Sequence, residues 1–299
     1  MGPKRFFPLL LLALIWGSYY VASQKAIERL SVFEAGVFIR LIALILLGAI
    51  MVGKGQLRLL FQVGKAWKRL LLIGLLGFLL DLTAFIGLSL SPAGSGTALL
   101  KCDILFVNLI SVCIYKEKFT RADWCCAFVM LGGVFLILDV NPFHLWSEGI
   151  GSLFFVLSAF FVSVNAFLIK SVQTDQRTPI EDNVIAFYNN FVTLLLFVTV
   201  SLITGGYRRK FDLQLPETAI PVLSAGVGQT LIYLVYYYNL RRHPVWLVKI
   251  FLLLMPIVSL LICLVLFSEV PKVSQSLGIV VILSGAAGLL LEQRRKSKI

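Results

Sequence analysis

Residues 94–138 read GSGTALLKCDILFVNLISVCIYKEKFTRADWCCAFVMLGGVFLIL. Two apolar runs, each long enough for a helix, flank a charged turn at residues 116–123. Lys101 and Asp103 lie within the first run, where the side chains of a lipid-spanning helix are normally apolar. The stretch therefore predicts an apolar helical hairpin with charges inside it.

The same plan recurs at residues 246–290, WLVKIFLLLMPIVSLLICLVLFSEVPKVSQSLGIVVILSGAAGLL. When Glu117 is aligned with Glu269, a glycine near the end of each copy is aligned too. In this alignment Lys101 and Lys249 differ by 4 residues, which is about one helical turn. The pattern indicates a duplicated hairpin that carries a lysine at a similar azimuth in each copy.

The composition predicts a membrane protein. The chain is 59% hydrophobic and 14% charged, whereas soluble domains carry roughly 25% charged residues. The net charge of +12 would suggest nucleic acid in a soluble protein, but here the basic residues cluster between apolar runs, as orientation signals do in membranes. The five cysteines lie inside apolar runs without a metal spacing, which favours small buried side chains.

Ten apolar runs are near the length that a bilayer requires. They fall at residues 6–24, 32–52, 69–90, 94–115, 122–139, 149–170, 181–204, 217–240, 244–267 and 273–291. Five helices per copy place the second copy upside down relative to the first. We therefore predict an all-α membrane protein, with ten transmembrane helices as an inverted five-plus-five repeat and domains at residues 1–140 and 141–299.

Capping signals and charge bias refine this prediction. Ser31 with Glu34 predicts a capping box on the second helix, and Thr178 with Glu181 predicts another on the seventh, with Pro179 at its first helical position. With the N-terminus in the cytoplasm, 18 Lys and Arg lie inside and 6 outside. This bias predicts that both termini are cytoplasmic.

Asp81, Lys101 and Asp103 are the first candidates for a functional site. Asp81 lies 10 residues before Ser91 and Lys101 lies 10 after it, so a hairpin turn there places both at one depth, about 15 Å from the turn. One interpretation is a cavity in which a zwitterion or a proton exchanges partners. The other is a fixed Asp81–Lys101 pair that locks two helices.

Lys249 and Arg40 are the other charges within apolar runs. Lys249 has no carboxylate in its own helix or at matching depth in the neighbouring helices. It either snorkels to the headgroups or faces a cavity, where it binds a carboxylate or gates the inner mouth. Arg40, a gating or structural charge, either snorkels or holds Glu34 or a substrate anion.

Polar and aromatic side chains on helix faces complete the predicted substrate site. Gln229, Tyr233 and Tyr237 follow one another at intervals of four residues and share one face of a helix. The other candidates of this kind are Trp16, Tyr20 and Asn165. Hydrogen bonding and packing between helices is the alternative interpretation of these residues.

The sequence holds no motif of a zinc protease, a serine hydrolase or a phosphate-binding loop. Its two histidines fall on loops at opposite faces of the predicted topology, which disfavours a histidine metal site. We expect no enzymatic activity, no cofactor and no nucleic-acid partner.

Three segments resemble the drug/metabolite transporter superfamily, specifically its ten-helix bacterial branch with paired EamA-type domains. They are residues 14–18 (LIWGS), residues 38–43 (FIRLIA) and residues 254–285, which include Met255-Pro256 and Ser284-Gly285. The resemblance covers the whole chain. The first copy departs from the family pattern, because Ile104 stands where the second copy has Pro256.

The resemblance implies a secondary exporter of small polar or amphipathic metabolites, such as amino acids, in the inner membrane of a bacterium. It implies alternating access around a central cavity, with a small-molecule substrate, the bilayer and a coupling proton as partners. Two alternatives remain open: a flippase or exporter for a lipid-linked or drug-like substrate, and a membrane receptor or assembly subunit that does not transport.

Overall fold

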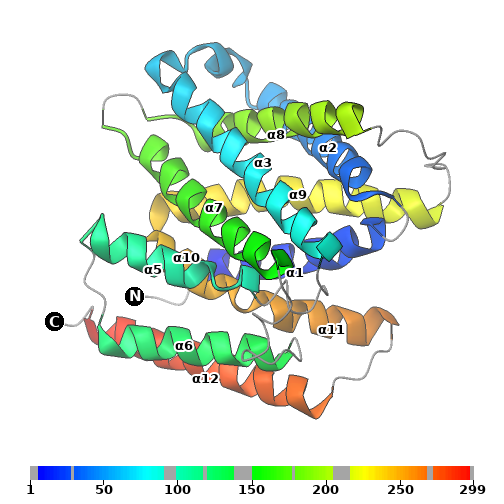
Figure 1. Cartoon of the computed structure of the whole chain (residues 1–299). Coiled ribbons are helices and arrows are strands. Elements are labelled where there is room, and N and C mark those ends of the chain that lie inside the picture. The colour runs from blue at the N-terminus through cyan, green and yellow to red at the C-terminus, as the bar shows by residue number, and fades with distance from the viewer. Residues whose placement is uncertain are drawn as a thin grey trace. The chain divides into compact units, whose positions relative to one another are not determined.

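The structure is a computed structural model of the whole chain (Figure 1). It describes residues 6–27, 30–90, 99–116, 120–137, 150–176, 179–204, 216–267 and 272–296. The turn predicted at residues 91–92 and the domain boundary predicted at residue 140 lie outside the described residues.

Every regular element within these ranges is a helix, which confirms the all-α prediction. In chain order the α-helices are α1 (Phe7–Ile27), α2 (Val32–Gly53), α3 (Trp67–Leu90), α5 (Asp103–Cys113), α6 (Arg121–Ile137), α7 (Ile150–Gln173), α8 (Asp182–Thr204), α9 (Pro216–Arg242), α10 (Val245–Leu252), α11 (Met255–Phe267) and α12 (Val273–Lys296). Two short 3₁₀ helices, η2 (Leu57–Phe61) and η3 (Gly64–Ala66), lie between α2 and α3.

Six helical stretches of the described chain are long and apolar enough to cross a membrane. They are Phe7–Ile27, Phe33–Gly53, Leu153–Gln173, Asp182–Ile203, Pro216–Arg242 and Val245–Leu266. The apolar helices Asp103–Cys113 and Val273–Gly288 are shorter. These stretches follow the predicted apolar runs closely, as expected when burial in lipid selects the sequence.

The chain forms two compact units. Unit 1 comprises residues 1–14, 80–164 and 243–299, and unit 2 comprises residues 15–79 and 165–242. Each unit draws on both predicted repeats.

In unit 1, α6 and α12 lie side by side (Figure 1) and approach closely enough for their backbones to touch. A Cβ added at Gly133 would lie 2.9 Å from the carbonyl oxygen of Gly278, and one added at Gly278 would lie 2.7 Å from that of Gly133. Gly285 packs in the same way against the Met130 side chain. Small residues of this kind permit the close helix packing that is common in membranes.

In unit 2, α2 packs against both α8 and α9. Ala35 and Ile39 of α2 form a buried cluster with Val222 and Ala225 of α9. The predicted capping box at the start of α2 is confirmed: the Glu34 amide donates to Ser31 Oγ over 3.2 Å. The Ser31 amide in turn donates to a Glu34 carboxylate oxygen over 2.9 Å.

The predicted placement of Pro179 at the first helical position of α8 is wrong. The helix begins at Asp182, and Pro179 lies before it in non-helical backbone, while Thr178 lies outside the described residues. Arg241 explains the later start, because its Nη2 donates to the Ile180 carbonyl over 2.6 Å and its Nε donates to Asp182 over 2.8 Å. These bonds hold the preceding segment against the end of α9.

Two helix breaks in unit 1 position the charged residues. Lys101 and Cys102 form a turn immediately before α5, and Leu253 and Leu254 form a turn between α10 and α11. Pro256 explains the second break, since proline has no amide hydrogen and its ring clashes with the carbonyl four residues earlier. Broken apolar helices in corresponding positions of two repeats are the usual place of a transporter's binding site.

Candidate functional site

The two broken helices of unit 1 are joined by a buried ion pair. Lys249 Nζ donates to Asp103 Oδ2 over 2.8 Å. The side chain of Lys249 is 2% exposed and that of Asp103 is 13% exposed. Asp103 lies in the first turn of α5 and Lys249 in the last turn of α10, so both charges are favoured by the helix dipoles.

Lys101 places a second ammonium beside this pair. Its Nζ lies 3.3 Å from the thioether sulfur of Met255, the first residue of α11. The turn at Lys101 and Cys102 therefore contacts α11, the helix that follows the break in the second copy of the repeat. A thioether is a weak, uncharged acceptor for an ammonium donor.

Ser163 of α7 supports the start of α5. Its hydroxyl lies 3.0 Å from the Asp103 carbonyl oxygen and 2.7 Å from that of Ala159. The hydroxyl is fully buried. This contact fixes the first turn of α5, and with it the direction of the Asp103 carboxylate.

The structure bears on the two interpretations of Lys249. Its side chain is buried and binds a carboxylate, and the role predicted for it in a cavity or at a gate stays a prediction. The partner is Asp103, which sequence reasoning had grouped with Asp81 and Lys101. Asp81 lies on α3, half-buried, in the same unit. The roles proposed for Asp81 stay predictions.

Asn108 and Ser111 are polar residues of α5 that sequence reasoning missed. Both are completely buried, and neither side chain has a hydrogen-bond partner among the described residues. They share the buried face of α5 with Asp103. The one feature of the sequence that could have indicated Asn108 and Ser111 is that they are polar residues within an apolar run.

Unit 2 contains a second cluster, centred on Arg40. This residue is 8% exposed, and its Nη1 donates to the hydroxyl of Tyr233. The rings of Tyr233 and Tyr237 meet edge to face with centroids 5.6 Å apart. Asn189 donates to the Tyr237 hydroxyl over 2.6 Å, and Asn190 donates to the Arg40 carbonyl over 2.8 Å.

The other predicted residues of unit 2 lie on α1, α7 and α9. The Trp16 ring meets the Tyr236 ring edge to face, with centroids 5.2 Å apart, and Tyr20 meets the neighbouring Tyr19. Gln229 and Asn165 are buried. The candidate residues thus divide by unit: Asp81, Lys101, Asp103 and Lys249 lie in unit 1, and Trp16, Tyr20, Arg40, Asn165, Gln229, Tyr233 and Tyr237 lie in unit 2.

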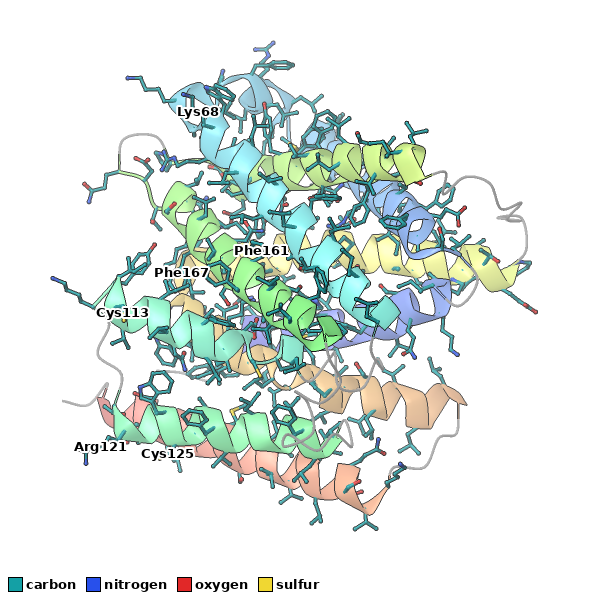
Figure 2. The ribbon with its side chains drawn as sticks, viewed as in Figure 1. Lys68, Cys113, Arg121, Cys125, Phe161 and Phe167 are labelled. Carbon is teal, nitrogen blue, oxygen red and sulfur yellow. The ribbon has the colours of Figure 1, made fainter. Side chains whose placement is uncertain are left out.

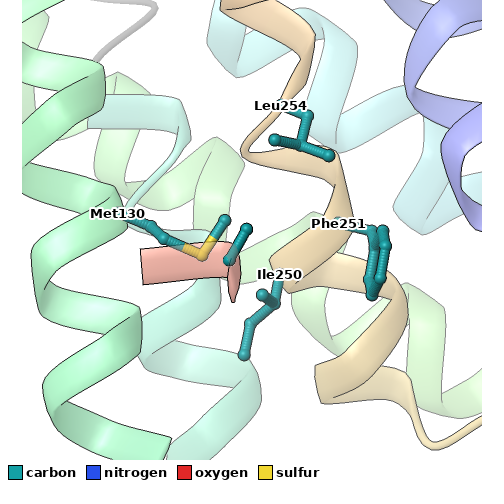
Figure 3. Close-up of a pocket in the computed structure, with 5 residues that line it drawn as sticks. Met130, Ile250, Phe251 and Leu254 are labelled. Carbon is teal, nitrogen blue, oxygen red and sulfur yellow. The ribbon is translucent and has the colours of Figure 1, made fainter. Parts of the chain in front are cut away.

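Neither of two cavities within the units has a charged lining. In unit 1 an apolar cavity of about 10 Å³ lies at the α10–α11 break, between Met130, Ile250, Phe251 and Leu254 (Figure 3). It is scarcely large enough for one water molecule. In unit 2 an apolar groove of about 410 Å³ runs between α2 and α9. Among the described residues no group of three or more His, Cys, Asp and Glu side chains is placed to hold a metal ion.

Comparisons with known proteins show the family and the fold of the chain. The model of the EamA-like transporter family matches twice, at residues 6–139 and 149–291. A solved structure titled "Crystal structure of protein" has a TM-score of 0.81, is 18% identical, and is matched over 99% of both chains. That likeness shows a shared fold. A search among curated proteins returned no match.

Proposed function

Because the chain belongs to the EamA-like transporter family, we propose that it is a secondary carrier that exports a small polar or amphipathic metabolite, such as an amino acid. The substrate would be exposed to each side of the membrane in turn. The carrier would sit in the inner membrane of a bacterium with both termini in the cytoplasm, as the bias of its basic residues favours.

The Lys249–Asp103 ion pair is the observation that carries the proposal. Burying two charges costs several kcal/mol per ion before their attraction is counted, and an apolar pair of similar volume is often as stable. Charges inside a membrane protein therefore mark substrate or proton pathways more often than they stabilise a fold. The position of this pair, where a helix start and a helix end meet, supports the same role.

We propose that an amino acid opens this pair. Its carboxylate would bind the Lys101 ammonium and then compete with Asp103 for Lys249. The freed Asp103 would accept the substrate's ammonium group. Each charge would exchange one partner for another and would never be unpaired in a medium of low dielectric constant. This keeps the free-energy barrier of the exchange low.

A coupling proton follows from the same exchange. When the substrate leaves, Asp103 would either return to Lys249 or bind the coupling proton. Proton uptake from outside would then drive export. The role predicted for the aromatic side chains of Trp16, Tyr233 and Tyr237, which lie in unit 2, stays a separate prediction.

Flux from sealed vesicles tests this function. Proteoliposomes that contain the purified chain are loaded with a mixture of radiolabelled amino acids, and efflux is followed with and without an inward proton gradient. We expect efflux above that of protein-free vesicles, accelerated by the gradient, and strongly reduced in Lys101→Met. The matched control is Lys272→Met, which removes an exposed lysine. Efflux from Lys101→Met at the wild-type rate would remove this lysine from the mechanism.

A further inference from the structure

The segment that joins α2 to α3, together with the first three residues of α3, comprises residues 54–69 and has the sequence KGQLRLLFQVGKAWKR. We call it the 54–69 loop. It contains five basic residues and no acidic residue. It includes the 3₁₀ helices η2 and η3, and it starts directly after the apolar stretch that ends at Gly53. The first turn of the loop is therefore at the depth of the lipid headgroups if α2 spans the membrane.

Four of the basic side chains are exposed: Lys54, Arg58, Lys65 and Lys68. Figure 2 shows the Lys68 side chain extending away from the ribbon at the start of α3. These cations are free to meet an external anion, and their shared sign gives the surface of the loop a concentrated positive potential.

Large apolar side chains lie among these cations. Phe61 is 89% exposed, Trp67 is 48% exposed and Leu57 is 41% exposed. Exposing such side chains to water is unfavourable, whereas the boundary between headgroups and acyl chains accommodates an aromatic ring beside a cation. The mixture therefore fits a lipid surface better than it fits water or a soluble polyanion.

The shape of the loop is fixed by three contacts with α8 and with the segment before it. Asn183 donates to Gln56 Oε1 over 2.6 Å, and the Tyr188 hydroxyl donates to the Leu60 carbonyl over 2.8 Å. Arg69 forms an ion pair of 2.6 Å with Asp175, so it is the one basic residue of the loop that another described residue neutralises. A fixed loop loses little conformational freedom when it binds, which favours a specific site.

We propose that the 54–69 loop is a binding site for the headgroups of anionic phospholipids. The phosphates pair with Lys54, Arg58, Lys65 and Lys68, and the rings of Phe61 and Trp67 lie at the level of the upper acyl chains. Basic residues also act as an orientation signal during insertion. The proposed lipid-binding site differs from an orientation signal, because it binds lipid after the protein has inserted and folded.

Quenching of tryptophan fluorescence tests the proposal. The full chain is reconstituted in vesicles that contain equal mole fractions of either brominated phosphatidylcholine or brominated phosphatidylglycerol. The difference between wild type and Trp67→Phe isolates the signal of Trp67. We expect phosphatidylglycerol to be enriched beside Trp67 by at least about tenfold, since each basic residue near the surface attracts anionic lipid separately.

The decisive comparison uses two variants that each lose four positive charges. Replacing Lys54, Arg58, Lys65 and Lys68 with Gln should abolish the preference for phosphatidylglycerol. Replacing Lys116, Arg121, Arg242 and Lys272 with Gln removes four exposed cations elsewhere and should leave it unchanged. Elution as a single species verifies folding. The proposal is overturned by equal quenching from both lipids in wild type, or by a preference that survives in the first variant. Neither result depends on whether the chain transports amino acids.

Discussion

Asp103 takes part in several interactions at the start of α5. Its carboxylate favours the start of α5 through the helix dipole, its carbonyl accepts a hydrogen bond from Ser163, and its Oδ2 accepts a hydrogen bond from Lys249 Nζ. The partner lies 146 residues away in the chain. Reasoning from neighbouring helices placed no carboxylate near Lys249, because it considered only the helices that are adjacent to Lys249 in the sequence.

The variant Asp103→Asn tests whether the ion pair forms as described. An amide cannot neutralise the Lys249 ammonium, so a buried charge remains, at a cost of about 3–5 kcal/mol in the free energy of unfolding. The measurement is equilibrium unfolding in mixed micelles. The double variant Asp103→Asn with Lys249→Met removes both charges and should recover most of the loss. A single variant as stable as wild type would mean that the two residues do not interact.

Tyr237→Phe tests the second cluster. Removing the hydroxyl leaves the Asn189 amide without this acceptor in a buried site, which should cost about 1–3 kcal/mol of stability. Tyr238→Phe is the matched control, since Tyr238 is 41% exposed on the same helix. We expect that control to unfold within about 0.5 kcal/mol of wild type. Equal losses in both variants would contradict the bond between Asn189 and Tyr237.

At the scale of elements, two adjacent glycines of α6 give a sharp test of the packing with α12. A Cβ at Gly133 would meet the Gly278 carbonyl, whereas one at Gly132 meets nothing within 4 Å. Gly133→Ala should therefore destabilise the protein by about 1–3 kcal/mol, because the helices must separate. Gly132→Ala should be neutral, or stabilising by up to about 1 kcal/mol through helix propensity. Thermal unfolding of both variants makes the comparison, and the reverse order would refute the close contact of α6 with α12.

Helix positions could be predicted well because length and hydropathy determine them. The runs predicted at residues 32–52 and 181–204 correspond to α2 and α8 within a residue or two. The breaks were harder to predict. Pro256 accounts for the start of α11, but no proline or glycine lies among residues 97–103, where the chain turns into α5. The first turn of α5 is held instead by contacts with Ser163 and Lys249. Pro179 was wrongly placed in the first turn of α8, because Arg241, which is distant in sequence, holds Ile180 outside the helix.

At the scale of the whole molecule, the repeat could be predicted and the grouping of the chain into units could not. The matches at residues 6–139 and 149–291 follow the two halves of the sequence, whereas each compact unit takes segments from both halves. Lys101 and Lys249 were chosen for their equivalent positions in the repeat. The structure places both in unit 1 with Asp103, which the alignment of the two copies alone does not require.

The central claim is that the Lys249–Asp103 pair takes part in transport and is not needed for the fold. The most direct test is efflux of labelled amino acids from vesicles that contain the double variant Asp103→Asn with Lys249→Met, after its folding has been verified by unfolding in micelles. We predict a folded protein whose efflux equals that of protein-free vesicles. Efflux at the wild-type rate, with the same response to a proton gradient, would contradict the claim.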